Sequence, residues 1–278
     1  MTLDRFSINQ ATLKLAPFEA VISALGDIGA SSVGVWRETI AELGANAVAS
    51  ALADAGVRAS SLCRGGFFTS NDAAAWSAAL DDNRRAIDEA AAIGAPALVL
   101  VAGGLPDGSR DLIGARARVR DAIGELEPHA SAVGVTLAIE ALHPMYAADR
   151  AVISTLGQAL DIAEQFPSRS VGVVVDTFHV WWDPQLAAQV ERAGAHHRIA
   201  SFQVCDWLTP IAADALLSRG YPGDGHIDFA SITQLVRDAG YTGDVEVEIF
   251  NQSVWDDDWL TVARTAADRY ERLVEPYL

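Results

Sequence analysis

Lysine is almost absent from this chain of 278 residues. Lys14 is the single lysine, and arginine supplies the rest of the 20 basic side chains. Schiff-base aldolases and pyridoxal-phosphate enzymes need a catalytic amine, so this scarcity argues against both classes. If the chain is an enzyme, we expect electrophilic catalysis to come from a metal ion instead.

Basic charge is scarce overall. The chain has 20 basic and 37 acidic side chains, a formal net charge of −17, and no basic run. Nucleic-acid binding depends on Lys and Arg that neutralise phosphates, so we expect no DNA or RNA partner. The acidity itself is typical of a well-solvated surface.

Cysteine and long apolar runs are also scarce. Cys63 and Cys205 are the two cysteines. They form no CxxC pair and nothing indicates an oxidising compartment, so we expect small apolar filler rather than a reactive thiol. No apolar run reaches the ~20 residues that span a bilayer. The opening MTLDRFSINQ lacks the succession of basic, apolar and small residues of a signal peptide. These absences predict a cytoplasmic protein that does not enter a membrane.

Strand and helix patterns alternate along the whole chain. Ala-rich stretches with apolar residues every three or four positions predict helices, and several of them end at a glycine. Short runs rich in Val, Ile or Leu predict eight strands, which begin near Arg5, Ser31, Val57, Pro96, Val135, Val171, Ile199 and Asp244. Eight alternating βα units predict a parallel sheet.

We predict that residues 1–278 form one domain of the α/β class, a single (β/α)8 TIM barrel. The active site of such a barrel lies at the carboxyl-terminal ends of its strands. An open doubly wound sheet is the alternative, but SINQATLK after the first strand contains no GxGxxG motif. Gly65 and Gly66 are expected to lie in a turn after the third strand.

The last four predicted strands carry an acidic or amide side chain near their ends. Glu140 ends VTLAIE, Asp176 ends VGVVVD, Gln203 lies in IASFQVCD, and Glu248 lies in VEVEIF. A carboxylate that leaves a buried strand is costly unless it is paired or bound to a metal. We therefore predict a divalent-metal site, with a salt bridge at the barrel mouth as the alternative for Glu140. The amide oxygen of Gln203 favours Mg²⁺ or Mn²⁺ over Zn²⁺.

Further candidates surround this set. His143 is either an acid/base or substrate contact or a packing residue, and His179 either ligates the metal or hydrogen-bonds a substrate oxygen. Glu246 is expected one layer deeper, where it could pair with an arginine. Flat aromatic walls such as Trp182 suit the apolar faces of sugars. Other residues that could contact substrate are Asp206, Arg219, His226 and, for an anionic group, Arg150. Asp228 is predicted to cap the helix that follows it.

The motifs IEALHP, VDTFH, FQVCDW, PGDGHIDF and GYTGDVEVEIF resemble those of the xylose isomerase-like TIM-barrel superfamily, also called the sugar phosphate isomerase/epimerase or AP endonuclease 2 family. The resemblance covers nearly the whole chain. It implies one divalent ion on Glu140, Asp176, Gln203 and Glu248, with Mn²⁺ or Mg²⁺ favoured and Co²⁺ or Zn²⁺ as alternatives. It also implies that His179 contacts the substrate.

The resemblance implies an isomerase or epimerase that removes a proton next to the carbonyl of a keto sugar or related polyol, through a metal-stabilised enediolate. Glu140 and Glu248 would act as acid or base, with His143 as the competing base. A lyase is the first alternative, either a keto-sugar or inosose dehydratase or the catalytic α subunit of a 3-keto C-glycoside deglycosidase with a separate β subunit. A homo-oligomer is also compatible. A non-catalytic sugar-binding or scaffold subunit is the second alternative.

Overall fold

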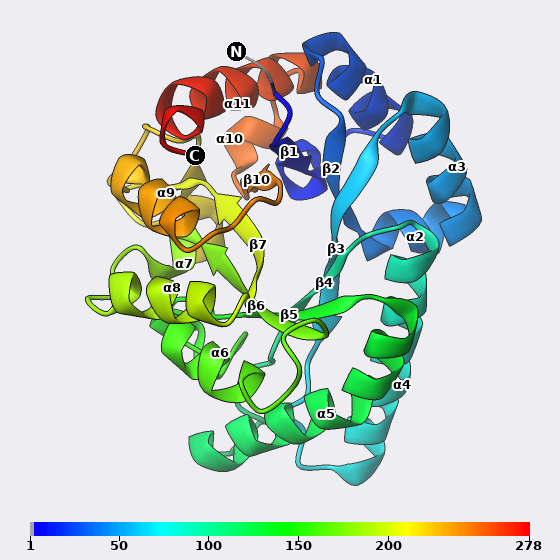
Figure 1. Cartoon of the computed structure of the whole chain (residues 1–278), viewed down its shortest axis with the longest axis vertical. Helices are drawn as coiled ribbons and strands as arrows, with labels where there is room; N and C mark the ends of the chain where they lie inside the picture. Colours follow the sequence, from blue (N-terminus) through cyan, green and yellow to red (C-terminus); the bar gives the residue numbers. More distant parts are fainter. Residues whose placement is uncertain (1–2) are drawn as a thin grey trace.

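Eight parallel strands close into a barrel at the centre of the molecule (Figure 1). The computed structural model describes residues 3–278. The strands follow the apolar runs of the sequence because both faces of each strand are buried, one inside the barrel and one under the helices. In order around the barrel they are β1 (Phe6–Asn9), β10 (Val245–Val247), β7 (Ile199–Val204), β6 (Val171–Asp176), β5 (Thr136–Glu140), β4 (Ala97–Val101), β3 (Arg58–Gly66) and β2 (Ser32–Trp36). The predicted (β/α)8 barrel is confirmed, and the open sheet is wrong.

Amphipathic helices surround the strands, as Figure 1 shows. Several end where predicted, because Gly29, Gly56 and Gly134 adopt the left-handed conformation at helix C-termini. No helix within residues 3–278 is long and apolar enough to cross a membrane. The longer helices are α1 (Phe18–Ile28), α3 (Ala45–Ala55), α4 (Ala73–Ala92), α5 (Leu112–Val133), α6 (Leu156–Ala163), α8 (Leu186–Ala195), α9 (Phe229–Asp238) and α11 (Trp259–Leu273).

Strand β3 is longer than the sequence suggests. Gly65 and Gly66 lie inside it and not in a turn, so that expectation is wrong. A Cβ atom on Gly66 would lie 1.8 Å from the carbonyl oxygen of Val101, and one on Gly65 would lie 2.3 Å from Oδ1 of Asn83. These glycines therefore permit close packing of β3 against β4 and α4.

Short elements collect at the carboxyl-terminal ends of the strands. Strands β8 (Asp206–Trp207) and β9 (Arg219–Gly220) form an antiparallel pair that places Arg219 opposite Trp207. This pair ties the long segment after β7 back to the barrel. The other short elements are the α-helices α2 (Arg37–Leu43), α7 (Thr177–Val180) and α10 (Gln252–Trp255), and the 3₁₀ helices η1 (Gln10–Leu13), η2 (Pro144–Tyr146), η3 (Ala215–Ser218) and η4 (Glu275–Tyr277).

Candidate active site at the carboxyl ends of the strands

A cavity of about 860 Å³ opens at the carboxyl-terminal ends of the strands. Besides Arg150, four of the residues proposed from sequence line it, namely Glu140, His179, Arg219 and Glu248. Each comes from a different strand end or from the short element that follows it, as the barrel predicts. The cavity is therefore the place where these side chains can meet one ligand.

The register of the strands places the proposed metal ligands in adjacent layers. Asp176 ends β6 and lies opposite Gln203 of β7, which in turn lies opposite Glu246 of β10. Glu248 follows the last residue of β10 and lies nearer the cavity than Glu246. All four of these side chains are at most 5% exposed, so groups inside the barrel, and not water, must balance their charges and dipoles.

Arg219 is the central cation of the site. Its Nη1 donates to carboxylate oxygens of Asp176 at 3.1 Å and Glu248 at 2.8 Å. The guanidinium lies between the rings of Phe178 and Phe250, with centroid distances of 4.7 and 5.0 Å. Its Nε is buried without a hydrogen-bond partner among residues 3–278. Arg219 thus keeps one donor that a ligand oxygen could use.

The carboxyl groups of the site hold protons more tightly than ordinary carboxyl groups. Burial raises the pKa of Glu140 well above its usual value, and the charges of Glu248 and Asp176 raise it further. Burial also raises the pKa of Glu248 to about 7, although Arg219 opposes the shift. The pKa of Asp176 is raised by burial and lowered in part by Arg219. Each shift reflects negative charge confined where water cannot solvate it.

The His179 ring lies beside these carboxylates. Its Nε2 is 3.9 Å from Glu140 Oε1 and 3.7 Å from Asp176 Oδ2. The main-chain N–H of His143 donates to its Nδ1 at 3.1 Å, while Nη2 of Arg219 lies 2.9 Å from its Nε2. A neutral imidazole accepts at one nitrogen only, so one of these two N–H groups is left without an acceptor. Burial and Arg219 lower the pKa of His179 well below its usual value, which keeps the ring neutral.

This donor set fits a divalent cation. One ligand atom each from Glu140, Asp176 and His179 lies within 4.8 Å of the others. Gln203, which pairs with Asp176 in the sheet register, has a carbonyl oxygen, Oε1, that is buried and has no hydrogen-bond partner among residues 3–278. A hard cation that accepts oxygen ligands would stabilise the ionised forms of these clustered carboxylates. It would also give the amide oxygen a partner.

Two of the proposed residues pack together outside the cavity lining. The His143 ring lies 5.3 Å from the Trp182 ring and 5.0 Å from the Trp207 ring, measured between centroids. Its Nδ1 accepts from the main-chain N–H of Met145, and burial lowers its pKa. The indole of Trp182 donates to the carbonyl of His179. The His143 ring therefore packs against the indole that holds the end of α7, the helix that contains His179.

Five other candidates have local partners. Asp206 is fully buried, and its carboxylate accepts from the main-chain N–H groups of Gly223, Gly225 and Ile227. The ring of His226 is exposed and bonds Thr209. Arg150 lines the cavity but pairs with Asp214. Asp228 caps α9 as predicted. Glu246 contacts amide and hydroxyl groups, and no salt bridge joins it to an arginine within residues 3–278.

Aromatic rings that are not among the predicted site residues form part of the cavity wall. Trp36, Phe250 and Trp255 form a row of edge-to-face rings with centroid distances of 5.7 and 6.2 Å. Cations lie over the two ends of this row, because Arg64 stands above Trp36 and Lys14 stands above Trp255. The tryptophans follow predicted strand ends, which is a usable pattern, but the two cations come from segments with no motif.

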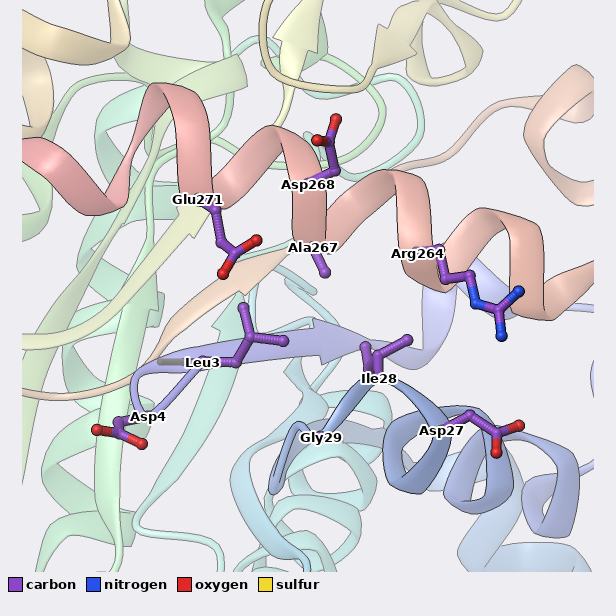
Figure 2. Close-up of a pocket in the computed structure, with 9 residues that line it drawn as sticks. All are labelled: Leu3, Asp4, Asp27, Ile28, Gly29, Arg264, Ala267, Asp268 and Glu271. Atoms are coloured by element: carbon purple, nitrogen blue, oxygen red, sulfur yellow. The ribbon is translucent and has the colours of Figure 1, made fainter. Parts of the chain in front are cut away.

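A second cavity of about 470 Å³ lies at the opposite end of β1, between α1 and α11. Asp4, Asp27 and Asp268 on its rim are exposed, and Asp268 pairs with Arg272. Figure 2 shows that its acidic side chains point in different directions and not toward a common centre. This arrangement is typical of a solvated surface and differs from the converging carboxylates at the carboxyl ends.

Comparison with known families shows to which family the chain belongs. The model of the xylose isomerase-like TIM barrel family matches residues 22–273. The chain belongs to this family. The resemblance of its motifs is thereby confirmed, and the family region contains each proposed metal ligand.

Individual members of the xylose isomerase-like family are similar to this chain to different extents. Inosose isomerase of Halalkalibacterium halodurans is 26% identical over 155 residues, which are 55% of this chain and 53% of that protein. The chain therefore spans about half the length of this curated relative. A crystal structure of a Sinorhizobium meliloti 1021 protein, named by its locus, has 45% identity and a TM-score of 0.95 over 98% of this chain and 99% of that one. The IolI protein with a bound zinc atom has 19% identity and a TM-score of 0.86 over 99% of both chains, a likeness of fold.

Proposed function

We propose that the protein is a divalent-metal-dependent isomerase or epimerase that acts on a keto sugar or a related polyol. The observation that carries this proposal is the presence of two buried carboxyl groups, Glu140 and Glu248, in one cavity beside a cluster able to hold a metal. A group with a pKa near ambient pH takes and returns protons readily, and the pKa of Glu248 is about 7. The inosose isomerase relative supports a keto polyol as the substrate class.

The proposed metal ligands are Glu140, Asp176, Gln203 and Glu248, and their oxygen atoms favour Mn²⁺ or Mg²⁺. His179 lies beside them. A bound divalent cation polarises a carbonyl oxygen and stabilises the negative charge that proton removal creates. Lys14, the single side-chain amine, lies over Trp255 at the wall of the cavity and has no part in this chemistry.

The proposed reaction moves one proton. A carboxylate, Glu140 or Glu248, takes the proton from the carbon next to the carbonyl, and the C–H bonding pair shifts toward the carbonyl oxygen. Return of the proton to the other face of the same carbon gives an epimer, and return to the former carbonyl carbon, after transfer between the oxygens, gives an isomer. Arg219 lines the cavity and has one N–H group, at Nε, without a partner among residues 3–278, and we assign this donor to a substrate oxygen. His179 offers a neutral imidazole to the same ligand.

A metal assay tests the site itself. Elemental analysis of the purified protein is expected to give about one Mn, Mg, Co or Zn ion per chain, consistent with a single ligand cluster. Asp176→Asn should lose this ion, because an amide is a weaker ligand than a carboxylate, and it keeps an oxygen that can cap the main-chain N–H of Phe178. An unchanged metal content in this variant, or no metal in either protein after soaking with Mn²⁺, would contradict the proposal.

Proton NMR in D₂O tests the reaction. Ketohexoses, their 3-keto glycosides and inososes are incubated with the protein, and the carbon next to the carbonyl is followed. Solvent deuterium without elimination supports an isomerase or epimerase, and a released aglycone or an enone means a lyase. Glu140→Gln and Glu248→Gln should stop exchange, while Glu125→Gln, an exposed carboxylate on α5, should not. Binding without exchange would mean a sugar-binding or scaffold subunit, and a partner subunit stays a prediction.

A further inference from the structure

Glu246 is a buried carboxylate for which the proposed reaction has no use. It is 1% exposed and points into the barrel interior, one layer below Glu248. Its register partners are Ser7 of β1 and Gln203 of β7. The hydroxyl groups of Ser60 and Ser61 also face it. A carboxylate in this position needs several hydrogen-bond donors, so its neighbours must present N–H or O–H groups toward it.

The amide orientation of Asn9 is fixed by two donors. Its Oδ1 accepts from the main-chain N–H of Ala11 at 3.0 Å and from the indole N–H of Trp36 at 2.6 Å. Because these two groups can only donate, the oxygen of the Asn9 amide must face them. The Nδ2 group therefore faces the other way, where it donates to Glu246 Oε2 at 2.9 Å.

The orientation of the Gln203 amide follows in the same way from its contact with Glu246. Gln203 Nε2 lies 3.4 Å from Glu246 Oε2, the oxygen that already accepts from Asn9. The reverse orientation of the Gln203 amide would set its oxygen against a carboxylate oxygen, which is repulsive. Gln203 Oε1 is thereby directed away from Glu246, and it is the buried atom without a hydrogen-bond partner among residues 3–278.

Gly34 provides the space that this arrangement needs. A Cβ atom at position 34 would lie 2.5 Å from Glu246 Oε2 and 2.7 Å from Asn9 Nδ2. Any other residue at this position of β2 would push the two side chains apart. The contact between Asn9 and Glu246 thus depends on a residue of a third strand. This dependence argues that the two side chains form a specific hydrogen-bonded network and do not merely fill space in the barrel.

We propose that Glu246 is a positioning residue that holds the Gln203 amide with its oxygen toward the metal site. The contacts run from Trp36 to Asn9, from Asn9 to Glu246, and from Glu246 to Gln203. The orientation of the Gln203 amide oxygen therefore depends on a residue of the cavity wall, Trp36. This inference rests on the proposed metal site. It deepens that proposal, because it assigns a role to a carboxylate that touches neither substrate nor metal.

A double-mutant cycle on metal affinity tests the assignment. Mn²⁺ is titrated into chelator-treated wild type, Glu246→Gln, Gln203→Ala and the double variant, and dissociation constants are measured. Glu246→Gln can donate to the Gln203 oxygen and turn the amide around, so affinity should fall by about 10- to 100-fold, as for other groups that orient a metal ligand. In the Gln203→Ala background the same change should have little further effect. Equal losses in both backgrounds, or no loss in the first, would overturn the proposal.

Two further variants keep the test independent of folding defects. Glu127→Gln removes a carboxylate that accepts from Ser170 on the outside of the barrel, and it should leave Mn²⁺ affinity unchanged. Trp36→Phe leaves Glu246 in place but removes one donor to Asn9, so its loss of affinity should be smaller than that of Glu246→Gln. If Glu246→Gln does not fold, an unchanged affinity in Trp36→Phe overturns the proposal.

The outcome also separates this inference from the proposed function. If wild type binds Mn²⁺ and the cycle shows coupling, but no sugar exchanges deuterium, the role of Glu246 stands and the proposed reaction falls. If wild type binds none of Mn²⁺, Mg²⁺, Co²⁺ and Zn²⁺, both are overturned. If deuterium exchange occurs and the cycle shows no coupling, only the role of Glu246 is lost.

Discussion

Arg219 Nη1 lies 2.8 Å from a carboxylate oxygen of Glu248, and both side chains are buried. The same nitrogen also reaches Asp176. This contact joins a cation from the β8–β9 pair to an acid that follows β10. It offsets negative charge that the barrel otherwise confines, so it stabilises the ionised carboxylates of the site.

Replacement of Arg219 by Gln should therefore destabilise the protein strongly. Removal of one partner of a buried ion pair costs about 3–5 kcal/mol, because the other charge is left uncompensated. Urea unfolding at pH 7 in the presence of a chelator would measure the loss. Arg237→Gln removes an exposed arginine that pairs with Asp238 and should change stability by about 0.5 kcal/mol or less. A loss of similar size in both variants would contradict this reading of the pair.

The contribution of Glu248 to the stability of the chelator-treated protein should decrease as pH rises from about 4.5 to about 7. Glu248 has a folded pKa of about 7 against an ordinary value of 4.5, so the folded state binds more protons in this interval. Its contribution is full below the unfolded pKa and is lost as pH rises through the folded pKa, by about 3 kcal/mol in total. Glu140 and Asp176 shift in the same direction.

Urea unfolding at several pH values would measure this slope. Glu248→Gln removes one titrating group and should flatten the curve, whereas Glu125→Gln should not. Added Mn²⁺ should also flatten it, because a cation favours the ionised carboxylates. A wild-type stability that does not fall relative to that of Glu248→Gln between pH 5 and 7 in the chelator would disprove the sign.

Asp206 should matter for the loop between β9 and α9 and not for metal binding. Its carboxylate accepts from three main-chain N–H groups of residues 223–227 and from that of Trp207. In Asp206→Asn the amide N–H₂ would face some of these donors, so the loss should be about 3 kcal/mol. Unfolding and hydrogen exchange of the loop would show it. Asp224→Asn, in the same loop, should cost about 1 kcal/mol or less. A large loss of Mn²⁺ affinity in Asp206→Asn would instead support a role at the cavity.

Gln203→His should shift metal preference toward Zn²⁺. An imidazole is a better ligand for Zn²⁺ than for Mg²⁺ or Mn²⁺, and Glu246 is available to accept its second N–H. Competition between Zn²⁺ and Mn²⁺ for the chelator-treated proteins would measure the ratio of the two dissociation constants. An unchanged ratio would mean that residue 203 is not a ligand.

The barrel and the residues at its strand ends were predictable because they follow from local patterns. Val-rich runs such as VGVVVD are stable as strands when both faces are buried. A polar residue after such a run marks the end of the strand, at the end of the barrel. Asp176 and Glu140 therefore ended their strands as expected. Strand β3 was misjudged at its glycines because close approach to Val101 is a tertiary requirement.

The contacts of the site could not be predicted from the sequence. Arg219 and Glu248 are 29 residues apart along the chain, and their pairing depends on how the β8–β9 pair folds back over the barrel. His143 follows a strand end just as Glu140 does, yet its ring turns toward Trp182 and Trp207. Arg64 and Lys14 approach the cavity over aromatic rings, an arrangement that no spacing in the sequence indicates.

The position of Lys14 makes the cavity accessible to selective chemical labelling. It is the single lysine of the chain, it is exposed, and its ammonium group lies 4.4 Å from the centre of the Trp255 ring. Apart from the α-amino group of the chain, an amine-reactive dye can attach to one side chain only, at the wall of the cavity and beside a natural fluorophore. Ligand entry into the barrel can then be followed as a change in energy transfer from tryptophan to the dye, without an engineered cysteine.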